Sequence, residues 1–242
     1  MTLRNEIVGS CLVCNGSGHV GFEPCSCLLK FRTYNRLINS GFYRNTIDIV
    51  SSPDYVLPEV GQGYSSLRFF QENLDFVLEK GLGLYMYSKE RGRGKTTLAH
   101  YLAYKIAEAT RPLDKYQRDL DFGFDHIEDF CKTENWKSRV YVLDDLGNEN
   151  RSASWKKEEF SSNLQKCLHY RRDRKLVTLI TSNYAPSNLS SLYEGVIDSL
   201  LEVNPMGIIG GIVFRQVEVV GGEDLRTVQE FSRWPELDQE NS

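Results

Sequence analysis

The chain has 242 residues, of which 40% are hydrophobic and 26% are charged, as in an ordinary globular protein. No stretch approaches the ~20 apolar residues that a membrane-spanning helix needs, and the N-terminus has no apolar signal core. We therefore expect a cytoplasmic protein with no membrane partner. The net charge of -4 argues against broad non-specific DNA binding. Any contact with nucleic acid must be local, or shared by a ring of subunits.

Four of the six cysteines lie close together near the start of the chain, at Cys11, Cys14, Cys25 and Cys27. In a reducing compartment such a cluster is more often a metal site than a disulfide framework. Four thiolates bind Zn²⁺ tetrahedrally, and a site without an open position is structural. The second pair has the less usual C-x-C spacing, so His19 is an alternative ligand. Reduced free thiols or a redox pair stay open as alternatives.

The composition divides the chain into three parts. Residues 1–50 hold the cysteine cluster and a segment with helical spacing, and form the expected zinc-binding module. Residues 51–66 are rich in Ser, Pro and Gly and indicate a connector. In residues 67–242 helical and strand patterns alternate, which predicts an α/β domain with a parallel sheet flanked by helices. The first part has little core of its own, so zinc would supply much of its folding free energy.

Periodicity predicts the elements of the third part in chain order. An amphipathic helix over residues 67–80 ends at Gly81, and a short buried strand follows at 84–87. The later elements are a helix at 95–109, a strand at 139–143, a helix at 155–172, a strand at 176–180, helical signals near 189–201 and a β segment at 212–220.

The loop after the strand at 84–87 indicates a phosphate-binding site. It ends in Gly-Lys-Thr and opens a helix, which is the context of the G-x-x-x-x-G-K-[ST] motif. Glycines let backbone N–H groups approach phosphates closely, and the helix N-terminus adds further donors. The first glycine of the motif is replaced by Lys89, so the entry turn must form without it. The residues expected to hold ATP or ADP are Gly92, Arg93, Gly94, Lys95, Thr96 and Thr97.

Polar residues at the ends of two later strands complete the expected site. Lys95 would reach the β- and γ-phosphates, while Thr96 and Asp144 would bind Mg²⁺, because carboxylates at the carboxyl end of a parallel strand face the ligand crevice. Asp145 would polarise the attacking water. Ring-forming ATPases commonly carry Glu there, so we expect slow hydrolysis. Asn183 would sense the γ-phosphate or the attacking water, with a plain Asx turn as the alternative.

In this order the motifs resemble those of the replicative-helicase loaders of the DnaC/DnaI type, in the IstB-like branch of the AAA+ ATPases. The resemblance rests on residues 92–97, 142–147 and 180–184, and on the cysteine segment, which is similar to the zinc-bearing N-terminus of many loaders. Residues 222–226 resemble the late arginine motif of that family, which implies that Arg226 is a catalytic sensor near the γ-phosphate. The resemblance further implies an ATP-dependent loader that delivers a DnaB-type helicase to DNA, forms homo-oligomers with ATP, and has single-stranded DNA as a further partner.

One departure from the family bears on catalysis. Ser199 stands where loaders carry an arginine that acts on the ATP of a neighbouring subunit. Arg171, Arg172 or Arg174 could substitute, although a solvated basic helix end explains them equally well. Three other functions stay open: a transposition helper ATPase of the IstB type, a nucleotide-gated binding protein with little hydrolysis, and a small-molecule kinase, for which we find no lid or acceptor pocket.

Overall fold

A central six-stranded sheet organises the structure, a computed structural model that describes residues 3–55, 64–110, 120–148, 154–185, 188–189, 208–209 and 212–219. Its strands lie in the order β4-β5-β6-β3-β8-β7, and all neighbours are parallel except β7 and β8. The strands are β3 Gly83–Tyr87, β4 Phe122–His126, β5 Val140–Leu146, β6 Val177–Ser182, β7 Ile208–Ile209 and β8 Ile212–Glu218. The predicted α/β fold with a parallel sheet is confirmed.

The central strands bury side chains on both faces of the sheet. In β5, Val140 and Val142 join one hydrophobic layer, whereas Tyr141 and Leu143 join the other. Alternation of this kind follows from the pleat, in which successive side chains point to opposite faces. Because helices cover both faces, the strand reads in the sequence as an almost continuous apolar run.

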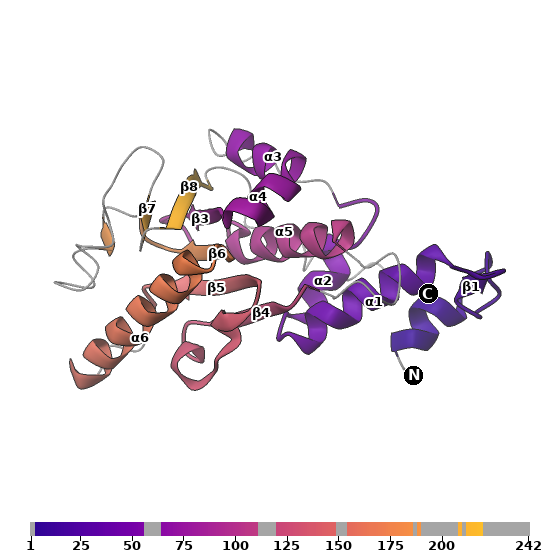
Figure 1. The fold of residues 1–242 in the computed structure, drawn as a ribbon, viewed down its shortest axis with the longest axis horizontal. Coiled ribbons are helices and arrows are strands. Elements are labelled where there is room, and N and C mark those ends of the chain that lie inside the picture. Colours follow the sequence, from indigo (N-terminus) through magenta and orange to yellow (C-terminus); the bar gives the residue numbers. More distant parts are fainter. Residues whose placement is uncertain are drawn as a thin grey trace, which may run out of the picture.

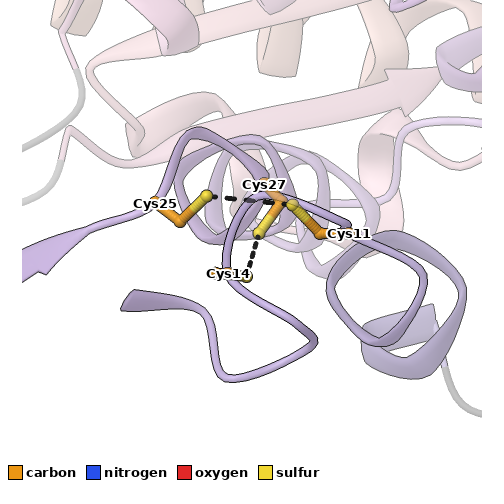
Figure 2. Close-up of side chains that lie close together, drawn as sticks. All are labelled: Cys11, Cys14, Cys25 and Cys27. Atoms are coloured by element: carbon orange, nitrogen blue, oxygen red, sulfur yellow. Dashed lines mark hydrogen bonds between the residues drawn. The ribbon is translucent and has the colours of Figure 1, made fainter. Parts of the chain in front are cut away.

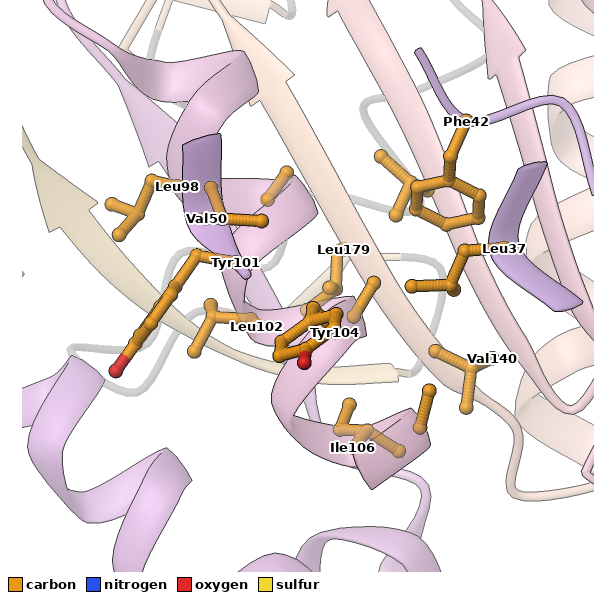
Figure 3. Close-up of a cluster of buried hydrophobic side chains, with 14 of the residues drawn as sticks. Leu37, Phe42, Val50, Leu98, Tyr101, Leu102, Tyr104, Ile106, Val140 and Leu179 are labelled. Carbon is orange, nitrogen blue, oxygen red and sulfur yellow. The ribbon is translucent and has the colours of Figure 1, made fainter. Parts of the chain in front are cut away.

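The first layer lies between the sheet and α5 (Lys95–Ala109), and two N-terminal helices pack against α5, one of which also contacts β4. These are α1 (Ser26–Asn39) and α2 (Arg44–Val50). Leu37 and Val50 bring them into the same core as the sheet (Figure 3). A buried aliphatic side chain of this size contributes about 1.5–3 kcal/mol. The helix that follows the phosphate loop is thus held on two sides.

The chain before β3 forms two helices, not the single helix predicted over residues 67–80. They are α3 (Tyr64–Glu72) and α4 (Leu74–Lys80). The break falls at Asn73, whose side-chain amide donates to the backbone carbonyl four residues earlier at 2.9 Å. An asparagine that bonds its own backbone competes with helix continuation. Gly81 ends α4 as predicted, with a left-handed φ of 65°.

The helix α6 (Ser154–Asp173) covers the opposite face of the sheet (Figure 1). Its buried side chains recur at helical spacing, at Phe160, Leu164, Cys167 and Leu168. Two short helical turns between β4 and β5 complete this second layer, η3 (Phe130–Lys132) and η4 (Asn135–Lys137).

The cysteine-bearing segment lies at one end of the long axis of the molecule, beyond the start of α1 (Figure 1). It contains a π-helical turn, η1 (Asn5–Gly9), and a small hairpin of β1 (His19–Val20) with β2 (Glu23–Pro24). The turn η1 packs against α1. Since α1 and α2 share the core of the sheet, the extent of a separate module within residues 1–50 stays a prediction.

The strands expected near residues 84–87, 139–143, 176–180 and 212–220 are confirmed as β3, β5, β6 and β8. The helices expected at 95–109 and 155–172 are confirmed as α5 and α6. The elements α2 and β4 were not predicted. Nearly all of the helical signal at 189–201 lies outside the described residues. Among the helices of the described part, none has the length and apolar character to cross a membrane.

Candidate functional site

The phosphate loop joins β3 to α5 and forms without the entry glycine of its motif. Gly92 and Gly94 have φ values of 79° and 80°, the left-handed conformation that favours glycine. Lys89, which replaces the missing glycine, is not among the described non-glycine residues with positive φ. The buried hydroxyl of Ser88 makes the turn instead, because it accepts the N–H of Glu90 at 3.3 Å. The departure from the motif therefore costs the loop no backbone strain.

Lys95 opens α5 and lies over the loop. Its side chain is buried, and its Nζ donates to the carbonyl oxygen of Glu90 at 3.3 Å. Arg93 forms an ion pair with the carboxylate of the same glutamate. The start of a helix presents backbone N–H groups, and the helix dipole favours an anion there. An anion in this loop would meet a lysine charge and backbone donors together.

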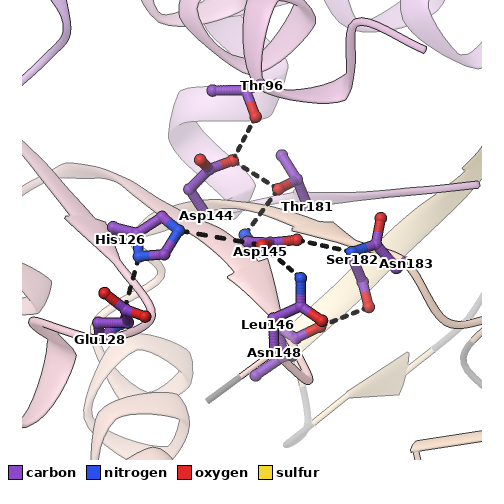
Figure 4. A network of polar contacts seen from close by, with 10 residues as sticks. All are labelled: Thr96, His126, Glu128, Asp144, Asp145, Leu146, Asn148, Thr181, Ser182 and Asn183. Atoms are coloured by element: carbon purple, nitrogen blue, oxygen red, sulfur yellow. Dashed lines mark hydrogen bonds and ion pairs between the residues drawn. The ribbon is translucent and has the colours of Figure 1, made fainter. Parts of the chain in front are cut away.

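Asp144 lies buried at the carboxyl end of β5, directly opposite the start of α5. Its Oδ1 accepts hydrogen bonds from the hydroxyl groups of Thr96 at 2.9 Å and Thr181 at 2.6 Å (Figure 4). Burial raises the pKa of this carboxyl group, and the two hydroxyl donors oppose the shift. The two residues expected to bind Mg²⁺, Thr96 and Asp144, are thus in direct contact. Their oxygen atoms suit a hard cation.

A β-bulge turns Asp145 toward the same space. The register of β5 against β6 shifts between Leu143 and Leu146, and Asp145 has a φ of 65°, in the left-handed region. Its N–H donates to the hydroxyl oxygen of Thr181 at 2.9 Å, which holds the unusual backbone in place. Bulges commonly re-aim side chains next to functional sites.

The carboxylate of Asp145 is held by amides on both sides. Asn183 donates to its Oδ1 at 2.9 Å and Asn148 to its Oδ2 at 2.5 Å (Figure 4). The Nε2 atom of His126 lies 3.9 Å from the same Oδ2. Asn183 therefore lies beside the residue expected to act on water, the position that a sensor role requires.

These residues surround a cavity of about 460 Å³, within the usual range for small-molecule sites. Among the described residues its lining contains every predicted nucleotide-binding residue together with both aspartates and Asn183. Five further lining residues were not predicted as site residues: Tyr43, Arg91, His126, Asn148 and Thr181. His126 ends β4 and would have been found had that strand been recognised. No sequence signal pointed to Tyr43, which comes from the N-terminal segment.

The arginines considered for catalysis have different outcomes. Arg226, and the Ser199 that replaces the expected arginine, lie outside the described residues. The suggestion that Arg171 acts on the ATP of a neighbouring subunit is wrong. Its guanidinium group is fully buried on the inner side of α6 and donates to backbone carbonyl oxygens. It cannot reach the nucleotide of a neighbour. Arg172 and Arg174 lie exposed at the end of α6 and stay candidates.

The four clustered cysteines converge on one point in the N-terminal segment (Figure 2). Their sulfur atoms all lie within 4.8 Å of one another. The Sγ atoms of Cys11 and Cys25 are 3.8 Å apart, and those of Cys14 and Cys27 are 3.5 Å apart. A tetrahedral Zn²⁺ with Zn–S bonds of ~2.3 Å requires sulfur separations of about 3.8 Å. The donor set and its spacing therefore fit zinc.

The surroundings of the cluster favour a thiolate at Cys14, whereas burial and hydrogen bonds with the other thiols raise the pKa of Cys27 to about 12. Burial opposes a charge on Cys14, but hydrogen bonds from the N–H of Gly18 and from the other thiols lower its pKa to about 6. The bond from Gly18 has a length of 3.2 Å. Gly18 needs its left-handed φ of 83° to present this N–H. His19, the alternative ligand, is exposed in β1 and is not part of the cluster in the described structure.

A solved structure shares this arrangement of strands and helices. No protein-family model and no curated protein matches the chain. The crystal structure of the DnaC helicase loader superposes with a TM-score of 0.52 at 21% identity, over 74% of this chain and 100% of that one. The chain has the fold of this helicase loader. The resemblance that the motifs indicated is thus confirmed at the level of the fold.

Two further structures are similar to the chain. DnaI superposes with a TM-score of 0.49 at 21% identity, over 74% of this chain and 92% of that one. AMPPCP-bound DnaA from Aquifex aeolicus superposes with a TM-score of 0.47 at 16% identity, over 74% of this chain and 53% of that one. At 21% identity, the similarity to the DnaC loader shows the fold alone.

Proposed function

We propose that this chain is an ATP-dependent adaptor that delivers a DnaB-type replicative helicase to DNA. The observation that carries the proposal is the contact between Thr96 of the phosphate loop and Asp144 of β5, inside a cavity of nucleotide size. Together, the phosphate loop and Asp144 supply what Mg²⁺–ATP needs, namely backbone N–H groups, a lysine and two oxygen ligands for the metal. The loader fold supports the assignment.

Each residue of the site has a separate role in this proposal. Lys95 and the N–H groups of the loop bind the phosphates, and Thr96 and Asp144 hold the metal ion, which neutralises phosphate charge when bound. Asp145 orients the attacking water, and Asn183 fixes the Asp145 carboxylate while it senses the terminal phosphate. Arg226 would approach the γ-phosphate from the late arginine motif. ATP binding would also favour homo-oligomers, with single-stranded DNA as a further contact.

The cysteine segment is the part that would contact the helicase. Zinc bound by Cys11, Cys14, Cys25 and Cys27 would fix two loops that carry exposed apolar side chains. These side chains are Leu12, Val13, Val20 and Phe22, of which Leu12 is 91% exposed and Phe22 fully exposed. Exposed apolar groups gathered on a small rigid element are typical of protein–protein contacts.

A capture experiment with the full chain tests the proposal. The purified replicative helicase of the same organism is immobilised, and the protein is applied with and without ATP. We expect capture that ATP modulates. Lys95→Ala should lose the effect of ATP, and Phe22→Ser should lose capture while it still binds ATP. Lys89→Ala is the matched control within the loop. Failure of the wild-type protein to bind the helicase in either state would refute the loader function.

One alternative has an observation in its favour. Both carboxylate oxygens of Asp145 are engaged by amides of Asn148 and Asn183, so the carboxylate is less available to a water molecule. A protein that binds ATP as an assembly signal and hydrolyses it little would show the same geometry. Turnover measured with and without the helicase separates the two functions, because only the loader cycle requires hydrolysis stimulated by the partner.

A further inference from the structure

Tyr43 is the part of the described N-terminal segment that reaches the nucleotide cavity. The other described lining residues belong to the phosphate loop, to the start of α5, or to the ends and following turns of β4, β5 and β6. Tyr43 instead precedes α2 and lies far from the phosphate loop in the sequence. It is half-exposed, so its side chain is accessible to a ligand in the cavity.

The position of Tyr43 is fixed by its backbone and its ring. Its N–H donates to Nε2 of His100 at 3.1 Å, and Nδ1 of His100 contacts the carbonyl oxygen of Thr96 at 2.8 Å. The two rings stack with centroids 5.3 Å apart, and the tyrosine meets Phe124 edge-on at 4.9 Å. Because His100 is fully buried, Tyr43 is anchored to the helical turn that carries Thr96.

Tyr43 shares the lining of the cavity with Thr96 and Asp144, the two residues expected to bind the metal. Burial and the nearby carboxylates, Asp144 foremost, raise the pKa of Tyr43 to about 12. The hydroxyl group therefore stays protonated near neutral pH and can act as a donor. A terminal phosphate bound beside the metal would offer this donor an acceptor oxygen.

We propose that Tyr43 is a further nucleotide-binding residue, whose hydroxyl group donates a hydrogen bond to the terminal phosphate of ATP. The inference rests on the proposed ATP site and extends it to the turn before α2, a helix that packs against α5. A donor to the terminal phosphate distinguishes ATP from ADP, since ADP has no γ-phosphate. Cys25 immediately precedes α1, Cys27 lies in its first turn, and a short turn after its end leads to Tyr43.

Nucleotide affinity measured by calorimetry tests the inference with three tyrosine variants. Tyr43→Phe retains the ring and removes only the hydroxyl group. We expect it to weaken ATP binding about tenfold or more, as for other hydrogen bonds to charged acceptors, and to leave ADP binding unchanged. Tyr43→Ala should weaken ATP binding as much or more. Tyr55→Phe is the matched control, because its ring packs on Tyr101 outside the cavity.

The outcomes separate this inference from the proposed function. If Tyr43→Phe binds ATP and ADP as the wild type does, while Lys95→Ala abolishes binding, the ATP site stands and the inference is wrong. If both nucleotides weaken equally in Tyr43→Phe, the residue does not read the terminal phosphate and the inference again fails. If the wild-type protein binds neither nucleotide, the proposed function fails. Thermal unfolding of each variant without nucleotide confirms that the fold is retained.

Discussion

Asp145 combines a short carboxylate with an unusual backbone. Its left-handed φ of 65° is held by Thr181, and its carboxylate lies between Asn183 and Asn148. Non-glycine residues in this conformation cost about 1–3 kcal/mol and persist where the surroundings determine them. The residue is therefore positioned before any ligand arrives, although its carboxylate extends less far than that of a glutamate.

We predict slow ATP hydrolysis by the protein alone, at or below the ~1 s⁻¹ that marks the lower end for ordinary enzymes. Asp145→Asn should lower turnover further and retain ATP binding, since the amide keeps the shape but loses the charge. Asp145→Glu should raise turnover, because the longer side chain reaches the water. Steady-state turnover and nucleotide affinity measure both effects. Faster turnover in Asp145→Asn would show that the residue has another role.

His100 predicts a pH dependence of stability. Burial lowers its pKa from 6.5 to about 4 in the folded chain. As the pH falls from about 6.5 to about 4, His100 becomes protonated in the unfolded chain but stays neutral in the folded chain. The free energy of unfolding therefore decreases. A shift of this size corresponds to about 3 kcal/mol. Chemical denaturation at several pH values measures it.

The variant His100→Gln isolates this contribution from that of other titrating groups. Glutamine does not titrate, and its amide oxygen can accept the N–H of Tyr43 in place of Nε2. The variant should be less stable at pH 7 but lose less stability between pH 6.5 and 4 than the wild type does. Parallel profiles of the two proteins would contradict the assignment of the pH dependence to His100.

At the scale of elements, a buried arginine joins α6 to the sheet and to the β4–β5 connection. The guanidinium group of Arg171 donates to Oγ1 of Thr178 at 2.7 Å and to the carbonyl oxygen of Ser138 at 2.8 Å. It also donates to the carbonyl oxygens of Trp136 and Val177, and lies 5.1 Å above the ring of Tyr141. Burial lowers its pKa to about 10, so it remains charged at pH 7.

Arg171→Met should therefore destabilise the fold strongly. Methionine fills much of the space but leaves several buried carbonyl oxygens without donors, at about 1–3 kcal/mol for each such group. We expect a loss of about 3 kcal/mol or more in the free energy of unfolding. Arg172→Met is the matched control on the exposed side, where the ion pair with Asp173 contributes little. Equal stability of the two variants would contradict the structural role of Arg171.

Most of the sheet could be predicted because its strands are apolar on both faces, as in β5. The strand β4 escaped because it contains Gly123, Asp125 and His126, residues depleted in strands or read as polar loop. These residues fit in the strand because of contacts with another element. A Cβ at Gly123 would meet the carbonyl oxygen of Asn135 at 2.3 Å, and Asn135 also donates to Asp125. Local pattern cannot report such partners.

In the candidate site, too, local sequence patterns predicted some residues, whereas packing between helices placed others. The phosphate loop, Asp144, Asp145 and Asn183 follow strands in a recognisable order, so sequence reasoning brought them together. Tyr43 enters the cavity only because α1 and α2 pack on α5, and that contact depends on residues scattered through three helices. The break at Asn73 was missed for a similar reason, since apolar spacing continues across it.

At the scale of the whole molecule, the metal should stabilise only the first part of the chain. We predict one Zn²⁺ per chain, and Cys14→Ser should release it and unfold the cysteine segment while ATP binding is retained. Residues 26–50 pack on α5 and should stay folded. Elemental analysis of protein purified without chelator measures the zinc, and circular dichroism with a nucleotide-binding assay measures the rest.

Cys131→Ser is the matched control, because this cysteine is exposed and lies outside the cluster. It should leave the zinc content unchanged. Zinc near zero in the wild-type protein, with all four clustered thiols freely titratable, would rule out the metal site. Loss of ATP binding in Cys14→Ser would instead show that folding of the segment extends further into the chain than we expect.

The length of α1 has a geometric consequence. Its 14 residues span about 21 Å, with the cysteine cluster at one end and the turn to Tyr43 at the other. An α-helix turns by about 100° per residue. One alanine inserted after Lys30 would therefore rotate the cysteine segment, with its exposed apolar side chains, to another side of the molecule. Four inserted alanines would restore nearly the original direction, about 6 Å farther out. The number of residues in α1 therefore sets the direction in which the cysteine segment points, independently of the nucleotide site.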